Sequence, residues 1–104
     1  MAIKFSRSVA SKLLSKHGVV EKEVVECFAN GEALYFRDTQ EDHDTDPPTM
    51  WFMSVTNRGR LLKVCFVQRG SDIDIKTAFE PKGPKPLETY IQLAKLPACW
   101  PSEE

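Results

Sequence analysis

Basic side chains recur through two predicted strands and their turns in the second half of the sequence. They are Arg58, Arg60, Lys63, Arg69 and Lys76. Guanidinium and ammonium groups bind phosphate oxygens and offset the charge that develops on a phosphorane during phosphodiester cleavage. The set therefore indicates phosphodiester chemistry that requires no metal ion, and the simpler interpretation is a group of solvated surface cations.

The two histidines are candidates for proton transfer, because imidazole titrates near neutral pH. His17 falls in the last turn of a predicted helix, where its charged form also interacts favourably with the helix dipole. His43 lies in a stretch, 38–49, that has acidic residues but no Lys or Arg.

That acidic stretch has two interpretations. Its side chains Asp42, His43, Asp44 and Asp46 are donors that could bind a metal ion. However, the sequence has neither the spacing of a calcium-binding EF-hand loop nor an HExxH motif. We therefore expect a solvated acidic loop, with no metal and no cofactor.

The overall composition is that of one globular domain, 1–104, with a modest core. A formal net charge of -1 excludes a generally basic nucleic-acid binder, although a local anion-binding face is still compatible with it. Cys27, Cys65 and Cys99 have no CxxC spacing and are expected to be reduced, with Cys27 and Cys65 in the core. No apolar run is long enough for a signal peptide or a membrane span, so a cytoplasmic protein is expected.

Hydrophobic periodicity predicts two helices, four strands and a final helix. The first helix begins near Ser6 or Ser8 and ends at Gly18, where a left-handed residue is favourable. The second helix spans 20–31, the strands span 32–38, 50–56, 61–68 and 73–79, and the last helix spans 87–95, followed by a tail over 96–104. This order predicts an α+β fold with a four-stranded, largely antiparallel sheet.

A two-residue turn at Arg58-Gly59 would set the register of the central hairpin. In that register Trp51, Met53 and Val55 lie opposite Phe66, Val64 and Leu62, on an apolar face that the helices cover. Lys63 and Lys76 would then project side by side from the opposite, uncovered face, and the phosphodiester hypothesis depends on this placement.

Several short motifs are shared with a known family. They are Phe5 and the segments 16–19 (KHGV), 23–28, 60–62 (RLL), 69–70 (RG), 73–78 and 88–90 (ETY). With these motifs the chain resembles the BrnT-type toxins of bacterial toxin–antitoxin pairs over residues 5 to about 92. The resemblance implies a RelE-like ribonuclease fold, an RNA substrate and a DNA-binding antitoxin as partner.

The hypothesis assigns a role to each candidate residue. The catalytic candidates are Arg60, Arg69 and Lys76, with His17 or His43 for proton transfer, and the candidates for binding RNA phosphates are Arg58, Lys63 and Lys16. The sequence departs from the family at Asp74 and Phe79, where those toxins typically have arginine.

Two alternatives remain open from the sequence. One is a non-catalytic module on the same scaffold that binds a protein through the acidic loop. The other follows from a closer resemblance, through FAN, EDH and TDPPT, to small proteins often labelled ADP-ribosyl-(dinitrogen reductase) hydrolases. The carboxylate scaffold of such dimetal enzymes does not occur in these 104 residues.

Overall fold

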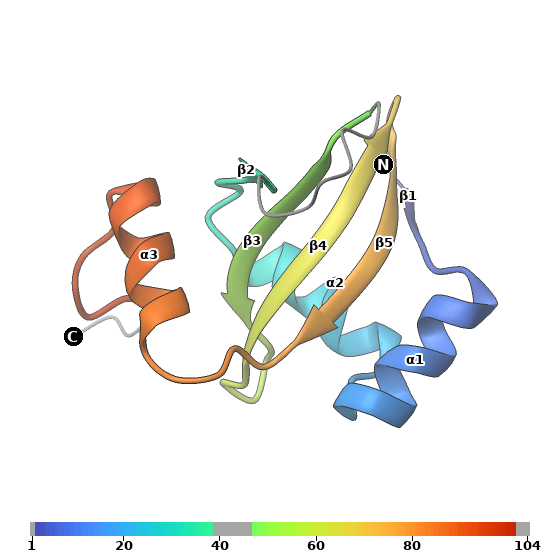
Figure 1. Ribbon diagram of the computed structural model, residues 1–104, viewed down its shortest axis with the longest axis horizontal. Coiled ribbons are helices and arrows are strands. Elements are labelled where there is room, and N and C mark those ends of the chain that lie inside the picture. Colours follow the sequence, from blue (N-terminus) through green and yellow to red (C-terminus); the bar gives the residue numbers. More distant parts are fainter. Residues whose placement is uncertain (1, 39–46, 102–104) are drawn as a thin grey trace.

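The computed structural model describes residues 2–38 and 47–101, and its centre is a five-stranded sheet in the order β1-β5-β4-β3-β2 (Figure 1). The elements in chain order are β1 (Ala2–Lys4), α1 (Arg7–His17), α2 (Glu21–Asn30), β2 (Phe36–Arg37), β3 (Thr49–Val55), β4 (Leu61–Arg69), β5 (Asp72–Phe79) and α3 (Lys85–Ala94). The predicted α+β order, with two N-terminal helices, a mostly antiparallel sheet and a C-terminal helix, is confirmed.

The sheet has one more strand than predicted, and it is mixed. The additional strand, β1, lies at the N-terminus and pairs in parallel with β5, with Ile3 opposite Ile73. The predicted strand 32–38 is reduced to β2, since Ala33 has φ 55, a left-handed conformation that interrupts an extended chain. The added strand β1 and the shortened strand β2 are the two edge strands of the sheet, where sequence periodicity is weakest.

The boundaries of α1 follow from local chemistry. The Ser6 hydroxyl accepts a hydrogen bond from the Val9 amide at 3.2 Å and so caps the first turn. Gly18, at φ 61, ends the helix in the left-handed conformation that glycine adopts without strain. Leu13 is buried beneath the helix, so the predicted amphipathic helix is confirmed.

The hairpin between β3 and β4 corrects the predicted two-residue turn. Thr56 and Arg60 close the loop through a 2.9 Å bond from Thr56 N to Arg60 O, which leaves residues 57–59 in the loop. The Thr56 hydroxyl also accepts hydrogen bonds from the backbone amides of Arg58 and Arg60, at 3.3 and 3.1 Å. Gly59 has φ 81, as a three-residue hairpin loop with a glycine bulge requires.

The longer loop shifts the register by one residue, and the predicted faces are therefore wrong. Trp51 pairs with Cys65 rather than Phe66. Because side chains alternate between the faces of a sheet, this shift separates residues that were expected on one face. Trp51, Met53 and Val55 share one face with Lys63, whereas Leu62, Val64 and Phe66 lie on the other.

A β-bulge in β5 changes the position of Lys76. Phe66 pairs with Ile75, but Cys65 pairs with Thr77, so Lys76 has no partner in β4. Such a bulge inserts one residue into a strand and leaves it outside the ladder. Beyond the bulge, Lys63 pairs with Phe79.

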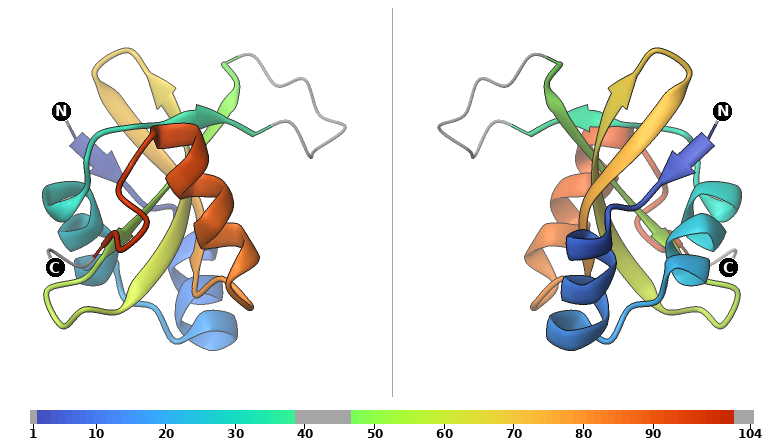
Figure 2. Two further views of the ribbon diagram at one scale, coloured as in Figure 1. Left: turned by 90° about the vertical axis from the view of Figure 1, so that its left-hand side faces the viewer. Right: turned by 90° about the vertical axis from the view of Figure 1, so that its right-hand side faces the viewer.

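Helices lie on both faces of the sheet (Figure 2). On one face, Phe28 of α2 packs against Phe52, with ring centroids 4.7 Å apart, and Cys27 is buried as predicted. On the other, which we call the outer face, Tyr90 of α3 packs against Trp51 at 5.5 Å. The Tyr90 hydroxyl donates a 2.7 Å hydrogen bond to the Leu34 carbonyl.

The described part of the expected tail lies against α3. Trp100 packs on Tyr90 at 5.4 Å, and its indole N–H donates to Glu32 Oε1 at 3.3 Å. Across residues 2–38 and 47–101, every helix is too short or too polar to cross a membrane.

Candidate functional site

The basic residues predicted to form one site are dispersed in the structure. Arg60 immediately precedes β4 and Arg69 ends it, which places them roughly 25–30 Å apart along an extended strand. Arg69 Nε donates to Asp74 Oδ2 at 2.8 Å, so a carboxylate partly neutralises this arginine. Asp74 thus forms an ion pair within the strand–turn–strand unit of β4 and β5.

Arg60 connects three segments of the chain. Its guanidinium donates to the carbonyl oxygens of His17 and Gly18, both at 2.9 Å. It also contacts both carboxylate oxygens of Glu23 at 3.1 Å and Glu80 Oε1 at 2.6 Å. Burial opposes its charge, but the hydrogen bonds to Glu80 and Glu23 outweigh burial and raise the pKa of Arg60. The geometry is that of a residue that joins the end of α1 to α2 and β5.

Lys63 and Lys76 do not lie side by side on neighbouring strands, and that prediction is wrong. Lys63 lies opposite Phe79, so Lys76 is three positions away along β5, or about 10 Å. Lys76 is exposed and lines a groove at the other side of β5, with Lys4 and Phe5. The bulge is the cause, since it removes Lys76 from the ladder.

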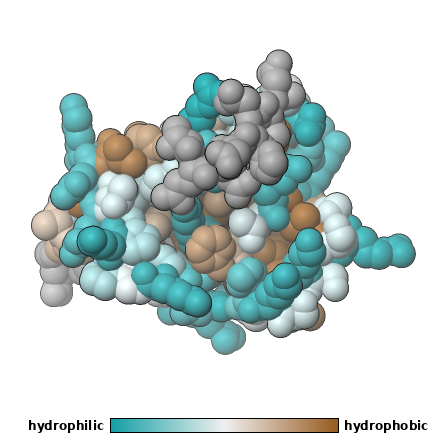
Figure 3. Space-filling model, viewed as in Figure 1, coloured by the Kyte–Doolittle hydropathy of each residue, from teal (hydrophilic) through white to brown (hydrophobic). Residues whose placement is uncertain are grey.

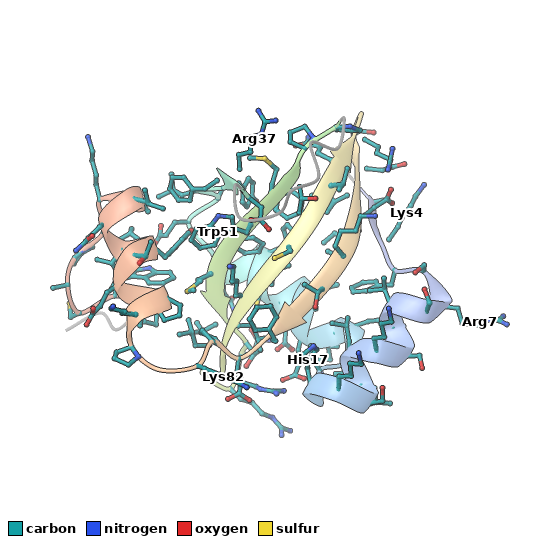
Figure 4. All side chains as sticks on the ribbon, viewed as in Figure 1. Lys4, Arg7, His17, Arg37, Trp51 and Lys82 are labelled. Atoms are coloured by element: carbon teal, nitrogen blue, oxygen red, sulfur yellow. The ribbon has the colours of Figure 1, made fainter. Side chains whose placement is uncertain are left out.

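A different set of residues comes together at the end of the sheet where α1 ends and β5 continues toward α3. A pocket of about 450 Å³ has His17, Lys63, Lys82 and Glu80 as its polar lining. Its apolar lining is Phe79, Pro81 and Pro86. Figure 4 shows His17 and Lys82 at the same lower end of the sheet. We call this set the β5–α3 pocket.

Each basic group of the pocket is positioned by a separate element. His17 is the last residue of α1, and its ring lies 5.6 Å from the ring of Phe79. Lys63 projects from the outer face with its Nζ 4.7 Å from the centroid of the Trp51 ring, a cation–π contact. Lys82 lies in the proline-rich connection between β5 and α3, where each proline fixes one backbone angle.

The charge of the pocket favours an anion with an apolar part. Three basic side chains face one carboxylate, and Glu80 is bound to Arg60 at 2.6 Å, which offsets its charge. Among the described residues, α3 packs on the outer face at β3, and the outer-face side chains Cys65 and Val67 of β4 are buried, whereas Lys63 is partly exposed. Figure 3 shows apolar surface near the middle of this face, with hydrophilic residues along its lower border. Such a site fits a phosphate attached to a flat organic group.

The remaining candidates lie elsewhere. Arg58 is exposed at the hairpin tip and lines a groove beside α2 with Glu26. Lys16 is exposed on α1 and is not part of the lining of the β5–α3 pocket. His43 lies outside the described residues, as does the acidic segment 39–46.

Sequence reasoning missed Lys82, Glu80 and Phe79. The segment 81–86 (PKGPKP) has two lysines and follows directly on a strand that ends beside Lys63. The signal in the sequence was a basic loop, restricted by its prolines, next to a strand that carries a basic residue.

Within 2–38 and 47–101, no group of three His, Cys, Asp or Glu side chains has an arrangement that could hold a metal ion. The protein thus belongs to the class of α+β domains with a mixed five-stranded sheet and a basic pocket on its outer face. The sequence matches no protein-family model and has no significant match among curated proteins.

Proposed function

We propose that the β5–α3 pocket binds RNA and that the protein is a toxin-like, metal-independent ribonuclease. The observation that carries the proposal is the meeting of His17, Lys63 and Lys82 around the ring of Phe79. Two ammonium groups supply phosphate contacts, and an aromatic ring supplies a surface on which a base can stack. The motifs shared with the BrnT-type toxins favour the same substrate.

The arrangement suits cleavage by the adjacent 2′-hydroxyl. Neutral His17 takes the proton of the 2′-hydroxyl while its oxygen attacks phosphorus, and the bond from phosphorus to the 5′ oxygen breaks. Lys63 and Lys82 offset the charge on the phosphorane oxygens. The leaving oxygen takes a proton from solvent, His17 returns its proton to solvent, and the products are a 2′,3′-cyclic phosphate and a 5′-hydroxyl.

The roles of the predicted arginines change under this proposal. Arg60 and Arg69 are bound to carboxylates, and Lys76 lies about 10 Å away along β5 from the strand position opposite Lys63. The function is therefore assigned to His17, Lys63 and Lys82, with Arg60 as a positioning residue that holds the His17 carbonyl. An antitoxin that covers the outer face would block this pocket, and we propose such a partner on the same resemblance.

The test compares purified wild-type protein with His17→Gln, Lys82→Ala and the matched control Lys12→Ala, an exposed lysine of α1. Each protein is incubated with a fluorescent single-stranded RNA, and the products are separated by electrophoresis. We expect wild type and Lys12→Ala to release 2′,3′-cyclic phosphate ends, and the other two to be at least tenfold slower.

Two results would count against the ribonuclease. If the RNA stays intact at wild-type protein concentrations at which it is bound, the protein binds RNA without cleaving it. Cleavage that His17→Gln and Lys82→Ala leave unchanged would move the site elsewhere.

A further inference from the structure

A second pocket adjoins the β5–α3 pocket on the outer face. It has a volume of about 350 Å³, and its apolar lining includes Trp51 and Leu93, with Arg37 and Thr89 among its polar groups. Both volumes lie within the range of small-ligand sites, roughly 300–1,000 Å³. We call it the β3–α3 pocket.

Lys63 belongs to both pockets, so its side chain forms their common boundary. The strands explain this position, because Lys63 in β4 pairs with Phe79 in β5 and its Nζ lies 4.7 Å from the centroid of the Trp51 ring in β3. An ammonium group thus stands between two aromatic side chains, one in each pocket. A phosphate at Lys63 would have an aromatic surface on either side of it.

We propose that the two pockets bind two consecutive nucleotides of single-stranded RNA, with the linking phosphate at Lys63 and one base in each pocket. The inference rests on the proposed function, which concerns only the β5–α3 pocket. Stacking on aromatic side chains is the usual way in which unpaired bases are held, and it is tolerant of sequence. A duplex does not fit this arrangement, because its bases are paired and stacked on each other.

Charge complementarity supports a nucleotide as the occupant of the second pocket. Arg37 adds a positive group to its lining, and Thr89 adds a hydroxyl that can bond to a phosphate or sugar.

The test uses the fluorescence of Trp51 to report binding in the β3–α3 pocket. The sequence has two tryptophans, so Trp100→Phe leaves Trp51 alone. This protein is titrated with 2′-O-methyl uridylates of one, two and three nucleotides, which the proposed reaction cannot cleave. We expect the dinucleotide to bind about tenfold tighter than the mononucleotide, which corresponds to one additional stacked base. Only the longer ligands should quench Trp51 fluorescence, and a third nucleotide should add less than twofold.

A charge change in the second pocket sharpens the test. Leu93 is 50% exposed, so Leu93→Glu should fold, and its carboxylate should repel the second nucleotide. We expect this variant to lose the tenfold gain and to keep the affinity for the mononucleotide. Gln92→Glu places the same charge on the neighbouring exposed position of α3, outside both pockets, and should leave the gain intact.

The outcomes separate this inference from the proposed function. Equal affinity for one and two nucleotides, with Lys82-dependent binding of the mononucleotide, would overturn the second subsite and leave the first. Absence of binding by all three ligands would overturn both. A duplex that binds as tightly as a single strand of equal length would also contradict the arrangement.

Discussion

The guanidinium of Arg60 donates a 2.9 Å hydrogen bond to the backbone carbonyl of His17, across a sequence separation of 43 residues. The helix end that carries His17 is thereby attached to the start of β4. The same guanidinium is bound to Glu80, so two polar side chains of the β5–α3 pocket depend on one arginine.

Replacement of Arg60 by methionine should destabilise the protein by about 2–4 kcal/mol, because carbonyl and carboxylate groups lose a charged partner. The control is Arg69→Met, which breaks the more exposed pair with Asp74 and should cost less than about 1 kcal/mol. Urea unfolding monitored by circular dichroism gives both values. Equal losses of stability in the two variants would show that the Arg60 network stabilises the protein no more than the exposed Arg69–Asp74 pair does.

Alkaline pH should destabilise the protein through Cys27. Burial raises the pKa of the Cys27 thiol to about 12 from an ordinary value of 9.0. Between these values the unfolded chain loses its proton first, so the free energy of unfolding falls as pH rises, by at most about 1.4 kcal/mol per pH unit. The stabilising contribution is complete below pH 9 and is lost as pH approaches 12.

The Cys27→Ala variant tests this titration. Urea unfolding at intervals from pH 8 to pH 10 gives the slope of the free energy of unfolding against pH for each protein. A cavity left by the smaller side chain lowers stability equally at each pH, so it does not affect this slope. We expect a smaller decline in the variant than in the wild type. Parallel curves would show that another group causes the decline.

Gly59→Ala should cost about 1–2 kcal/mol, because the left-handed backbone at φ 81 places a Cβ in an unfavourable position. No heavy atom lies within 4 Å of the added Cβ, so the cost comes from the backbone alone. Arg58→Ala, at the neighbouring exposed position, should change stability by less than about 0.5 kcal/mol. Thermal unfolding measures the stability of both variants. Equal stability of Gly59→Ala and Arg58→Ala would contradict the three-residue loop with a left-handed Gly59.

Salt should weaken RNA binding in proportion to the number of phosphates contacted. Lys63 and Lys82 contact the same linking phosphate of the dinucleotide, so the logarithm of its affinity should fall against the logarithm of salt concentration with a slope of about −0.7. Lys82→Ala should make this slope shallower, and Lys12→Ala should not change it. Fluorescence anisotropy at several salt concentrations measures the slopes, and an unchanged slope in Lys82→Ala would remove this lysine from the phosphate contacts.

Local signals in the sequence predict the secondary structure well. Ser6 and Gly18 bound α1 by capping, and the apolar alternation of β4 and β5 is visible without any partner. β2 was predicted too long and β1 was not predicted, since a two- or three-residue edge strand depends on its neighbour more than on its own pattern. Such strands form only where a sheet is already present.

The candidate site was predicted only in part. His17 and Lys63 were among the residues chosen, and the structure places them in one pocket. Arg60 was chosen as a catalytic candidate, and its partners are 37 and 43 positions away in the chain, so they could not be inferred from local patterns. Lys76 was misplaced by the bulge, a feature that periodicity does not reveal.

The sequence by itself determined the helices, the central strands and the α+β order, because capping, glycine conformation and hydrophobic periodicity act between near neighbours. The tertiary structure alone decided which faces the side chains occupy. One extra loop residue at 57–59 exchanged the faces of β3, and one bulged residue removed Lys76 from the ladder. Since side chains alternate along a strand, a displacement of a single residue is enough to move a charge from one site to another.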